Sequence, residues 1–280
     1  MSGQPPTDGP GKMLRDYKNI KVNLALGTPV TVAVNNYRNH SYGSPGVGTQ
    51  DAMQIKDALM SLDWKDVLTR SGGPRPYMRV FAGKGSPKEI AKVLQTLYHY
   101  CTVDPGKFDR VFNGRGGVCM KVAGLLHDRF FDVEVPIWEA RLRWQARLQN
   151  VTNEVIGLDC NGFVGNWLAE AAPTLNLGPE TPESHMLDEA KRLHTPIRRT
   201  VAEIQGTDII LWEDKRHIAA VDSVVNRASG EFMICQSAAG GPRSDKYTIT
   251  EQMLTKPSRP GFKLVGGPRG GSVEVFTLWK

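Results

Sequence analysis

The chain has 280 residues, 40% of them hydrophobic and 23% charged, with a formal net charge of +6 and a pI near 9.1. This composition is typical of a folded protein with one large or two modest domains, and no apolar run approaches the roughly 18 residues of a membrane span. The positive charge either favours an anionic polymer as partner or reflects only a solvated, mildly basic surface. The absence of a Lys/Arg run or a known binding motif argues against nucleic acid.

Residues 1–15 are rich in Pro, Gly and polar residues and are expected to be disordered. This start has neither the basic nor the apolar part of a signal peptide, so we expect synthesis in the cytoplasm. The cysteines show no CxxC spacing, which argues against a zinc site or a disulfide framework, and we expect free thiols. They are Cys101, Cys119, Cys160 and Cys235. The glycines near the C-terminus follow no phosphate-loop spacing and precede a strand, which argues against nucleotide binding. We expect neither a metal nor a cofactor.

Residues 16–150 are expected to form a mixed α/β, mainly helical region. The stretch from Ile20 to Val34 alternates and is β-branched, which indicates strands. A helix start is indicated at Ser86, followed by Pro87 and by Glu89 in the first turn. The expected elements are helices over 51–68, 86–101, 118–131 and 138–149, and a short strand over 77–81.

One cysteine of this region, Cys119, stands at a predicted helix start behind Gly116 and Gly117. The stretch from Arg115 to Leu126 resembles the cysteine box of transglutaminase-like proteins. That family also needs a downstream His–aromatic strand and an Asp strand, and we find no such pair at a fitting spacing. Cys119 is therefore one candidate nucleophile, and the chief rival of Cys160, which is described next. Alternatively, its side chain only packs the start of a helix.

Residues 151–280 contain a second cysteine box, Gly157-Leu158-Asp159-Cys160-Asn161-Gly162-Phe163-Val164. Asp159 or Asn161 can cap the helix that follows. A thiol in the first turn of a helix faces backbone N–H groups and the positive end of the helix dipole, and both favour thiolate. Without further partners, a buried structural cysteine would explain the pattern equally well.

Downstream elements supply possible partners for Cys160. Strands are expected over 205–212, 216–221, 231–237, 247–250 and 272–279, with a short helix over 183–193. His217 opens the second of these strands and Gln236 lies on the third. A cysteine on a helix, a histidine on a strand and a polar group on the next strand can meet as nucleophile, base and orienting residue.

The order of these boxes resembles the NlpC-like cysteine peptidases, over roughly residues 150–280. The resemblance implies an α+β fold, with a papain-like catalytic core in which an antiparallel sheet carries a nucleophile-bearing helix, beside the mainly helical N-terminal region. The implied domains are residues 16–150 and 151–280. Carried over by position, Cys160 is the nucleophile, His217 the general base and Gln236 the orienting residue. Asn161 stands where the family usually has Ser, and Gln236 where it more often has His.

The resemblance implies cleavage of a peptide or amide bond in bacterial peptidoglycan by thiol acyl transfer. The thiolate attacks the carbonyl, and backbone N–H groups at the helix start, including that of Cys160, stabilise the oxyanion. We also expect Asp159, Asn161 and Trp212 to contact the substrate. Two alternatives stay open: acyl transfer or amide hydrolysis on a substrate outside the cell wall, and an inactive papain-like fold that serves as a binding module.

The expected cell-wall substrate raises the question of how the protein leaves the cytoplasm. A cell-wall enzyme made in the cytoplasm without a signal peptide needs lysis, a phage particle or a secretion machine to reach its target. An immunity or delivery protein is then a possible partner, and we expect neither nucleic-acid binding nor membrane insertion. The sequence does not indicate the oligomeric state.

Overall fold

The computed structural model describes residues 4–38, 47–62, 75–127, 135–214, 216–255 and 258–279. The chain divides into two compact units, one formed by Met1–Arg15 together with Asp159–Lys280 and the other by Asp16–Leu158. The expected boundary at residue 150 lies inside helix α8 (Ile137–Glu154), which continues because Val151 and Thr152 extend its buried side. The division between the two units lies between Leu158 and Asp159.

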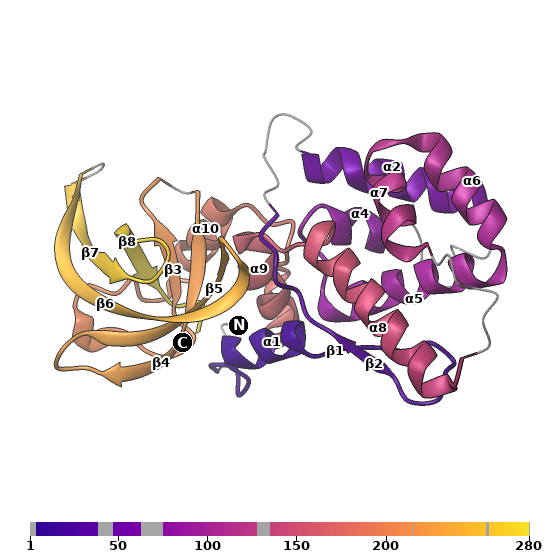
Figure 1. Cartoon of the computed structure of the whole chain (residues 1–280). Helices are drawn as coiled ribbons and strands as arrows, with labels where there is room; N and C mark the ends of the chain where they lie inside the picture. The colour runs from indigo at the N-terminus through magenta and orange to yellow at the C-terminus, as the bar shows by residue number, and fades with distance from the viewer. Residues whose placement is uncertain are drawn as a thin grey trace. The chain divides into compact units, whose positions relative to one another are not determined.

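The unit Asp16–Leu158, called the helical unit below, contains a two-stranded antiparallel sheet and a set of helices (Figure 1). Strands β1 (Ile20–Val22) and β2 (Val30–Val32) pair with Ile20 opposite Val32, as the alternation predicts. The helices are α2 (Val47–Leu62), α4 (Arg75–Phe81), α5 (Pro87–Val103), α6 (Pro105–Arg115), α7 (Gly117–Leu126) and α8.

Helix α5 begins as its sequence predicts. The Ser86 hydroxyl accepts a hydrogen bond from the Glu89 backbone N–H at 3.3 Å, and the Glu89 carboxylate accepts one from the Ser86 N–H at 2.9 Å. This reciprocal cap satisfies two N–H groups that have no partner inside the helix. The apolar side of the helix is buried at Ile90, Val93, Leu94 and Leu97, which recur at helical spacing.

Two expectations for the helical unit are wrong. Residues 77–81 form a helix, α4, and not a strand, because Tyr77, Val80 and Phe81 are all buried and lie three and four residues apart. Helix α6 was not predicted, although Asp104 caps it and Pro105 opens it. The predicted helical residues 63–68 and 128–131 lie outside the described residues.

The second unit, called the barrel unit below, contains a closed antiparallel barrel of six strands in sequence order (Figure 1). The strands are β3 (Ile209–Trp212), β4 (Ile218–Asn226), β5 (Glu231–Ala238), β6 (Gly241–Thr255), β7 (Ser258–Gly266) and β8 (Gly271–Phe276). Closure comes from pairing of β8 with β3, in which Ile209 lies opposite Phe276. The sheet that we expected to be antiparallel is thus also closed, and β7 is a strand that the sequence analysis missed.

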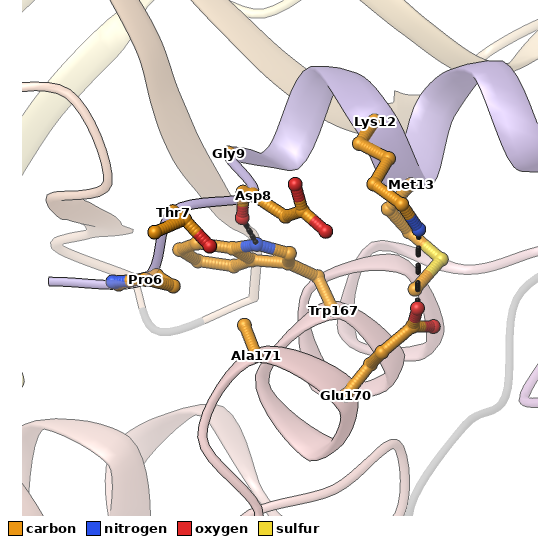
Figure 2. Close-up of a pocket in the computed structure, with 9 residues that line it drawn as sticks. All are labelled: Pro6, Thr7, Asp8, Gly9, Lys12, Met13, Trp167, Glu170 and Ala171. Carbon is orange, nitrogen blue, oxygen red and sulfur yellow. Dashed lines mark hydrogen bonds and ion pairs between the residues drawn. The ribbon is translucent and has the colours of Figure 1, made fainter.

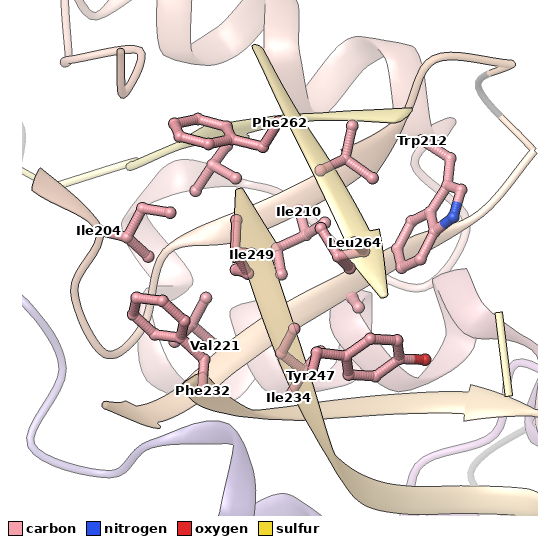
Figure 3. Packing of buried hydrophobic residues seen from close by; sticks show 13 residues of the cluster. Ile204, Ile210, Trp212, Val221, Phe232, Ile234, Tyr247, Ile249, Phe262 and Leu264 are labelled. Carbon is pink, nitrogen blue, oxygen red and sulfur yellow. The ribbon is translucent and has the colours of Figure 1, made fainter. Parts of the chain in front are cut away.

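Buried apolar side chains fill the barrel (Figure 3). Every second residue of a strand points into the barrel, as Phe232 and Ile234 do on β5. Trp212 and the hydroxyl end of Tyr247 lie toward the same side of the cluster (Figure 3). Gln236 continues the spacing of Phe232 and Ile234 and is fully buried, so β5 carries one polar side chain on its inward-facing side.

Two α-helices follow one another in the chain before the barrel. Helix α9 (Cys160–Ala171) packs against β4 and β5, and α10 (Glu183–Arg192) follows it. Gly165 permits the backbone of Gly178 and Pro179 to lie against α9, because a side chain at position 165 would collide with both. Short 3-10 turns at Pro173–Leu175 and Val201–Glu203 complete the connections.

Residues 10–15, which we expected to be disordered, form the first part of helix α1 (Pro10–Lys18). The Gly11 N–H donates to Asp222 Oδ1 at 2.8 Å, and Met13 is buried. Figure 2 shows the segment beside Trp167 of α9, whose indole N–H donates to the Asp8 carbonyl at 3.1 Å. A cavity of about 220 Å³ lies between segment and helix. These contacts order a segment whose composition alone indicates disorder.

None of the helices in the described part of the chain combines the length and the apolar character needed to cross a bilayer.

Candidate active site

Cys160 is the first residue of helix α9. The preceding residue, Asp159, has the extended backbone of an N-cap, and its carboxylate accepts a hydrogen bond from the Gly162 N–H at 2.5 Å. The cap fixes where the helix begins, and with it the position of the thiol. Only 3% of the Cys160 surface is exposed. The thiol therefore lies at the positive end of a helix dipole, as the sequence predicts.

The start of α10 lies beside this thiol. Cys160 Sγ is 3.9 Å from Glu183 Oε1, a distance that fits a weak S–H hydrogen bond to the carboxylate. The side chain of Asn161 is fully buried, and its Nδ2 donates to the Thr181 carbonyl. The cysteine box is thus held against the segment 181–183. Sequence reasoning did not select Glu183, because nothing local relates residues 23 positions apart.

His217 lies directly before strand β4, and its carbonyl accepts the Trp212 N–H at 3.1 Å. The side chain is 98% buried. Its ring stands edge-on to the Trp212 ring, with centroids 4.6 Å apart. Nε2 lies 2.7 Å from Gln236 Oε1, so the structure brings together the histidine and the glutamine that the sequence analysis paired.

The surroundings of Gln236 fix which way its amide points. The amide nitrogen lies 2.6 Å from the Tyr247 hydroxyl and 3.4 Å from a carboxylate oxygen of Asp245, which only accepts hydrogen bonds when ionised. The amide oxygen therefore faces His217 and must accept, so Nε2 of the imidazole carries the proton. In the neutral ring the other nitrogen, Nδ1, is then the one able to take up a proton.

Burial lowers the pKa of His217 to about 4. The Gln236 hydrogen bond opposes this shift, the positive charge of Arg269 adds to it, and the negative charge of Asp214 opposes it. The imidazole is thus neutral near pH 7, as a base must be before it accepts a proton. Two acidic residues near His217 in the sequence have other partners: Asp214 pairs with Arg269 at 2.8 Å, and Asp222 accepts the Gly11 N–H.

Helix α9 packs against β4, which follows His217, and against β5, which carries Gln236. The three residues predicted to be catalytic therefore come from elements that pack on one another within the barrel unit. Hydrogen bonding joins His217 to Gln236, whereas the thiol of Cys160 is directed to Glu183.

A surface cleft of about 470 Å³ adjoins the ring of Trp212. It is lined by Trp212, Glu213, Asp214, Thr255, Arg269, Gly270, Gly271 and Ser272. Of the three residues expected to contact substrate, Trp212 lines this cleft, with its indole N–H donating to the Gly270 carbonyl at 3.3 Å. Asp159 and Asn161 are buried, and their side chains form the local hydrogen bonds described above.

The rival thiol has different surroundings. Cys119 is the third residue of α7, where Gly116 provides no side-chain cap, and burial raises its pKa to about 11. Of the histidines nearby in the sequence, His127 pairs with Asp109 at 3.0 Å. Burial also raises the pKa of Cys235 to about 12. None of the four cysteines forms a disulfide.

Tyr247 and Asp245 are site residues that the sequence analysis missed. They hold the amide of Gln236 from strand β6, the antiparallel neighbour of β5. The available signal was the alternation that places Asp245, Tyr247 and Ile249 on one face of a strand. Arg243 in turn binds Asp245 with Nε–Oδ2 and Nη2–Oδ1 distances of 2.8 and 2.7 Å.

Within the described residues, no group of three or more His, Cys, Asp or Glu side chains is arranged to hold a metal ion. Comparisons with protein-family models, with curated proteins and with solved structures found no match to this chain.

Proposed function

We propose that this protein is a cysteine hydrolase that cleaves a peptide or amide bond, with Cys160 as nucleophile, His217 as general base and Gln236 as the residue that orients the histidine. The observation that carries the proposal is the 2.7 Å contact between His217 Nε2 and Gln236 Oε1. It selects the tautomer in which Nδ1 is unprotonated, and a neutral, buried imidazole in that tautomer is suited to take a proton from a thiol.

In the proposed reaction, the thiol of Cys160 first leaves Glu183 and approaches His217. Its proton then moves to His217 Nδ1, and the sulfur attacks the carbonyl carbon. The oxyanion forms at the positive end of helix α9. The C–N bond then breaks, and the departing nitrogen takes the proton from Nδ1. Water adds to the thioester after giving a proton to the same nitrogen, and collapse of this second intermediate releases the acid and restores the thiol.

We propose a peptide or amide bond of bacterial peptidoglycan as the substrate. The support for this substrate is the resemblance of the cysteine box and the following strands to NlpC-like peptidases, together with the positive net charge, which favours an anionic polymer. The cleft beside Trp212 offers a place for the chain of the substrate.

The test is incubation of purified cell-wall fragments with the wild-type protein and with Cys160→Ala, followed by mass spectrometry of the products. Hydrolysis adds the mass of one water across the cleaved bond, and we expect it with the wild type alone. Products linked to an added amine would indicate acyl transfer in place of hydrolysis. Binding of the fragments by both proteins without any new product would contradict the proposal and favour a binding module.

A further inference from the structure

Glu183 occupies an unusual position beside the proposed nucleophile. Its carboxylate oxygen Oε1 lies 3.9 Å from Cys160 Sγ. Within the described residues, no Lys, Arg or His side chain forms an ion pair with it, whereas two other acidic residues of helix α10 are paired: Asp188 with Lys191 at 3.5 Å and Glu189 with Arg192 at 2.5 Å. The carboxylate in contact with the thiol thus forms no ion pair with a described residue.

The position of Glu183 at the start of α10 explains part of this arrangement. An acid in the first turn interacts favourably with the helix dipole. The dipole does not, however, account for the direction of the side chain toward a thiol. A carboxylate there opposes the formation of thiolate, since like charges repel at this distance. A group that disfavours the reactive form of the proposed nucleophile needs a further function in the site.

A second observation comes from Asn161. Its amide nitrogen donates to the carbonyl of Thr181, two residues before Glu183. Its amide oxygen is buried and accepts no hydrogen bond from the described residues. A buried acceptor without a donor is costly, and native proteins rarely leave one without a reason. The residue that holds the segment 181–183 therefore carries a buried acceptor that lacks a donor.

We infer that Glu183, together with the unsatisfied amide oxygen of Asn161, forms a subsite for a primary ammonium group on the substrate. An ammonium group provides three donors and one positive charge, which matches an unpaired carboxylate and an unused carbonyl oxygen. Its binding neutralises the charge of Glu183, so thiolate formation at Cys160 becomes easier when a cationic substrate is present. Glu183 is then a specificity-determining residue. The inference rests on the proposed function only for the identity of Cys160 as the nucleophile.

The test uses three small thiol reagents of equal chemistry and different charge. 2-Aminoethyl, methyl and 2-sulfonatoethyl methanethiosulfonate are a cation, a neutral molecule and an anion. Each forms a mixed disulfide with the thiolate and releases methanesulfinate. The rate of modification of Cys160 is measured by peptide mass spectrometry and divided by the rate of each reagent with 2-mercaptoethanol, which removes intrinsic reactivity.

We expect the normalised rate of the cationic reagent to exceed that of the anionic one by about tenfold or more, because the Glu183 charge outweighs the partial charge of a helix end. In Glu183→Gln the ratio should fall at least fivefold. Asp188→Asn is the matched control, since it removes one negative charge from the same helix, and it should keep the wild-type ratio. The wild-type ratio should also shrink as the salt concentration rises.

Equal rates for the two charged reagents, preference for the anion, or a ratio unchanged in Glu183→Gln would overturn the inference. Failure of all three reagents to modify Cys160 in the folded protein would also overturn it, because an ammonium group could then not reach the carboxylate. If Glu183→Gln does not fold, the salt dependence of the wild type decides: a selectivity for the cation that is insensitive to salt contradicts a charged subsite.

A second arm uses turnover of two amide substrates that differ only in a primary amine beside the scissile bond, free in one and acetylated in the other. We expect kcat/KM to be at least tenfold higher for the free amine, and the difference to be lost in Glu183→Gln. The two arms separate the proposals. Charge-selective labelling without any turnover contradicts the hydrolase but keeps the subsite, whereas turnover that is indifferent to the amine contradicts the subsite alone.

Discussion

The helical unit and the barrel unit each place a cysteine near the start of a helix, and the two sites differ in almost every other respect. Cys119 lies in a helix whose N-cap is a glycine, and its burial raises its pKa to about 11. Cys160 follows an aspartate that caps its helix, and it lies beside a carboxylate, in the unit that also holds a neutral, oriented histidine. A helix start therefore does not identify a nucleophile; the elements packed around it do.

The largest expected effect tests this difference directly. Cys160→Ala should abolish measurable hydrolysis, because the acyl-enzyme cannot form, whereas Cys119→Ala should keep activity within about threefold of the wild type. The measurement is turnover of cell-wall fragments, with thermal unfolding as a check on folding. We expect Cys119→Ala to lose about 1 kcal/mol of stability through a small buried cavity. Loss of activity in Cys119→Ala alone would reverse the assignment.

Thiol labelling sharpens the same comparison without a substrate. With pKa values of about 11 and 12, Cys119 and Cys235 hold on the order of 0.1% thiolate or less at pH 8. Stoichiometric iodoacetamide should therefore label Cys160 before either of them. Peptide mass spectrometry over a time course locates the label, and a urea-unfolded sample shows that all four thiols are chemically competent. Earlier labelling of Cys119 would support the transglutaminase-like alternative.

The buried histidine predicts how the stability of the barrel unit depends on pH. The pKa of His217 is about 4 in the folded protein, below its ordinary value of 6.5, so the unfolded chain binds more protons between these two values. The contribution of His217 to stability is complete above pH 6.5 and is lost as the pH falls toward 4. It amounts to at most about 3 kcal/mol.

Urea unfolding at several pH values measures this contribution, with His217→Gln as the comparison. The variant should show a weaker dependence on pH between 6.5 and 4 than the wild type, whatever its absolute stability. Identical slopes would mean that His217 is not buried in its neutral form.

The orienting residue should have a smaller effect than the nucleophile or the base. Gln236→Ala removes the acceptor that fixes the His217 tautomer, but it removes no charge, and we expect turnover to fall by about 10–100-fold, or roughly 1.4–2.7 kcal/mol. Gln236→Glu restores an acceptor and adds a negative charge, and it should shift the acidic limb of the kcat/KM profile to higher pH. A merely structural role of Gln236 would leave that profile unmoved. Full activity in Gln236→Ala would remove Gln236 from the proposed site.

The smallest effect concerns the helical unit. Ser86→Ala removes one half of the reciprocal cap of helix α5 and should lower the free energy of unfolding by about 1 kcal/mol. Activity at a temperature well below the transition should stay unchanged, since the cap lies in the unit without the proposed nucleophile. Thr102→Ala, whose hydroxyl lies within helix α5 and donates to the Tyr98 carbonyl, is a control on the same helix that leaves the cap intact.

What the sequence predicted well is local. The cap at Ser86, the helix start at Cys160 and the order of strands β3 to β5 follow from residues within one or two turns of each other. The errors also have local causes: the apolar residues 77–81 are too few to separate a strand from a short helix, and Phe108 and Phe112 of α6 form a pair four residues apart that was overlooked.

What could not be predicted depends on distance along the chain. Closure of the barrel pairs β3 with β8, which lie more than 60 residues apart, and no local pattern encodes that register. The proximity of Glu183 to Cys160 and the support of Gln236 by Tyr247 arise only once helices and strands have packed. The pairing of His217 with Gln236 was accessible because a simple hairpin joins their strands.

One consequence of the unit division concerns the order in which the protein is made. The barrel unit is discontinuous in the chain, since residues 1–15 belong with residues 159–280 and the helical unit is inserted between them. On the ribosome, Gly11 and Asp8 are made before the insertion, whereas their hydrogen-bond partners, Asp222 and Trp167, are made after it. The helical unit can complete its fold first, while the N-terminal segment waits for Asp222 to emerge. Helix α9, which carries Cys160, therefore gains its contacts with the N-terminal segment late, after the helical unit has been made.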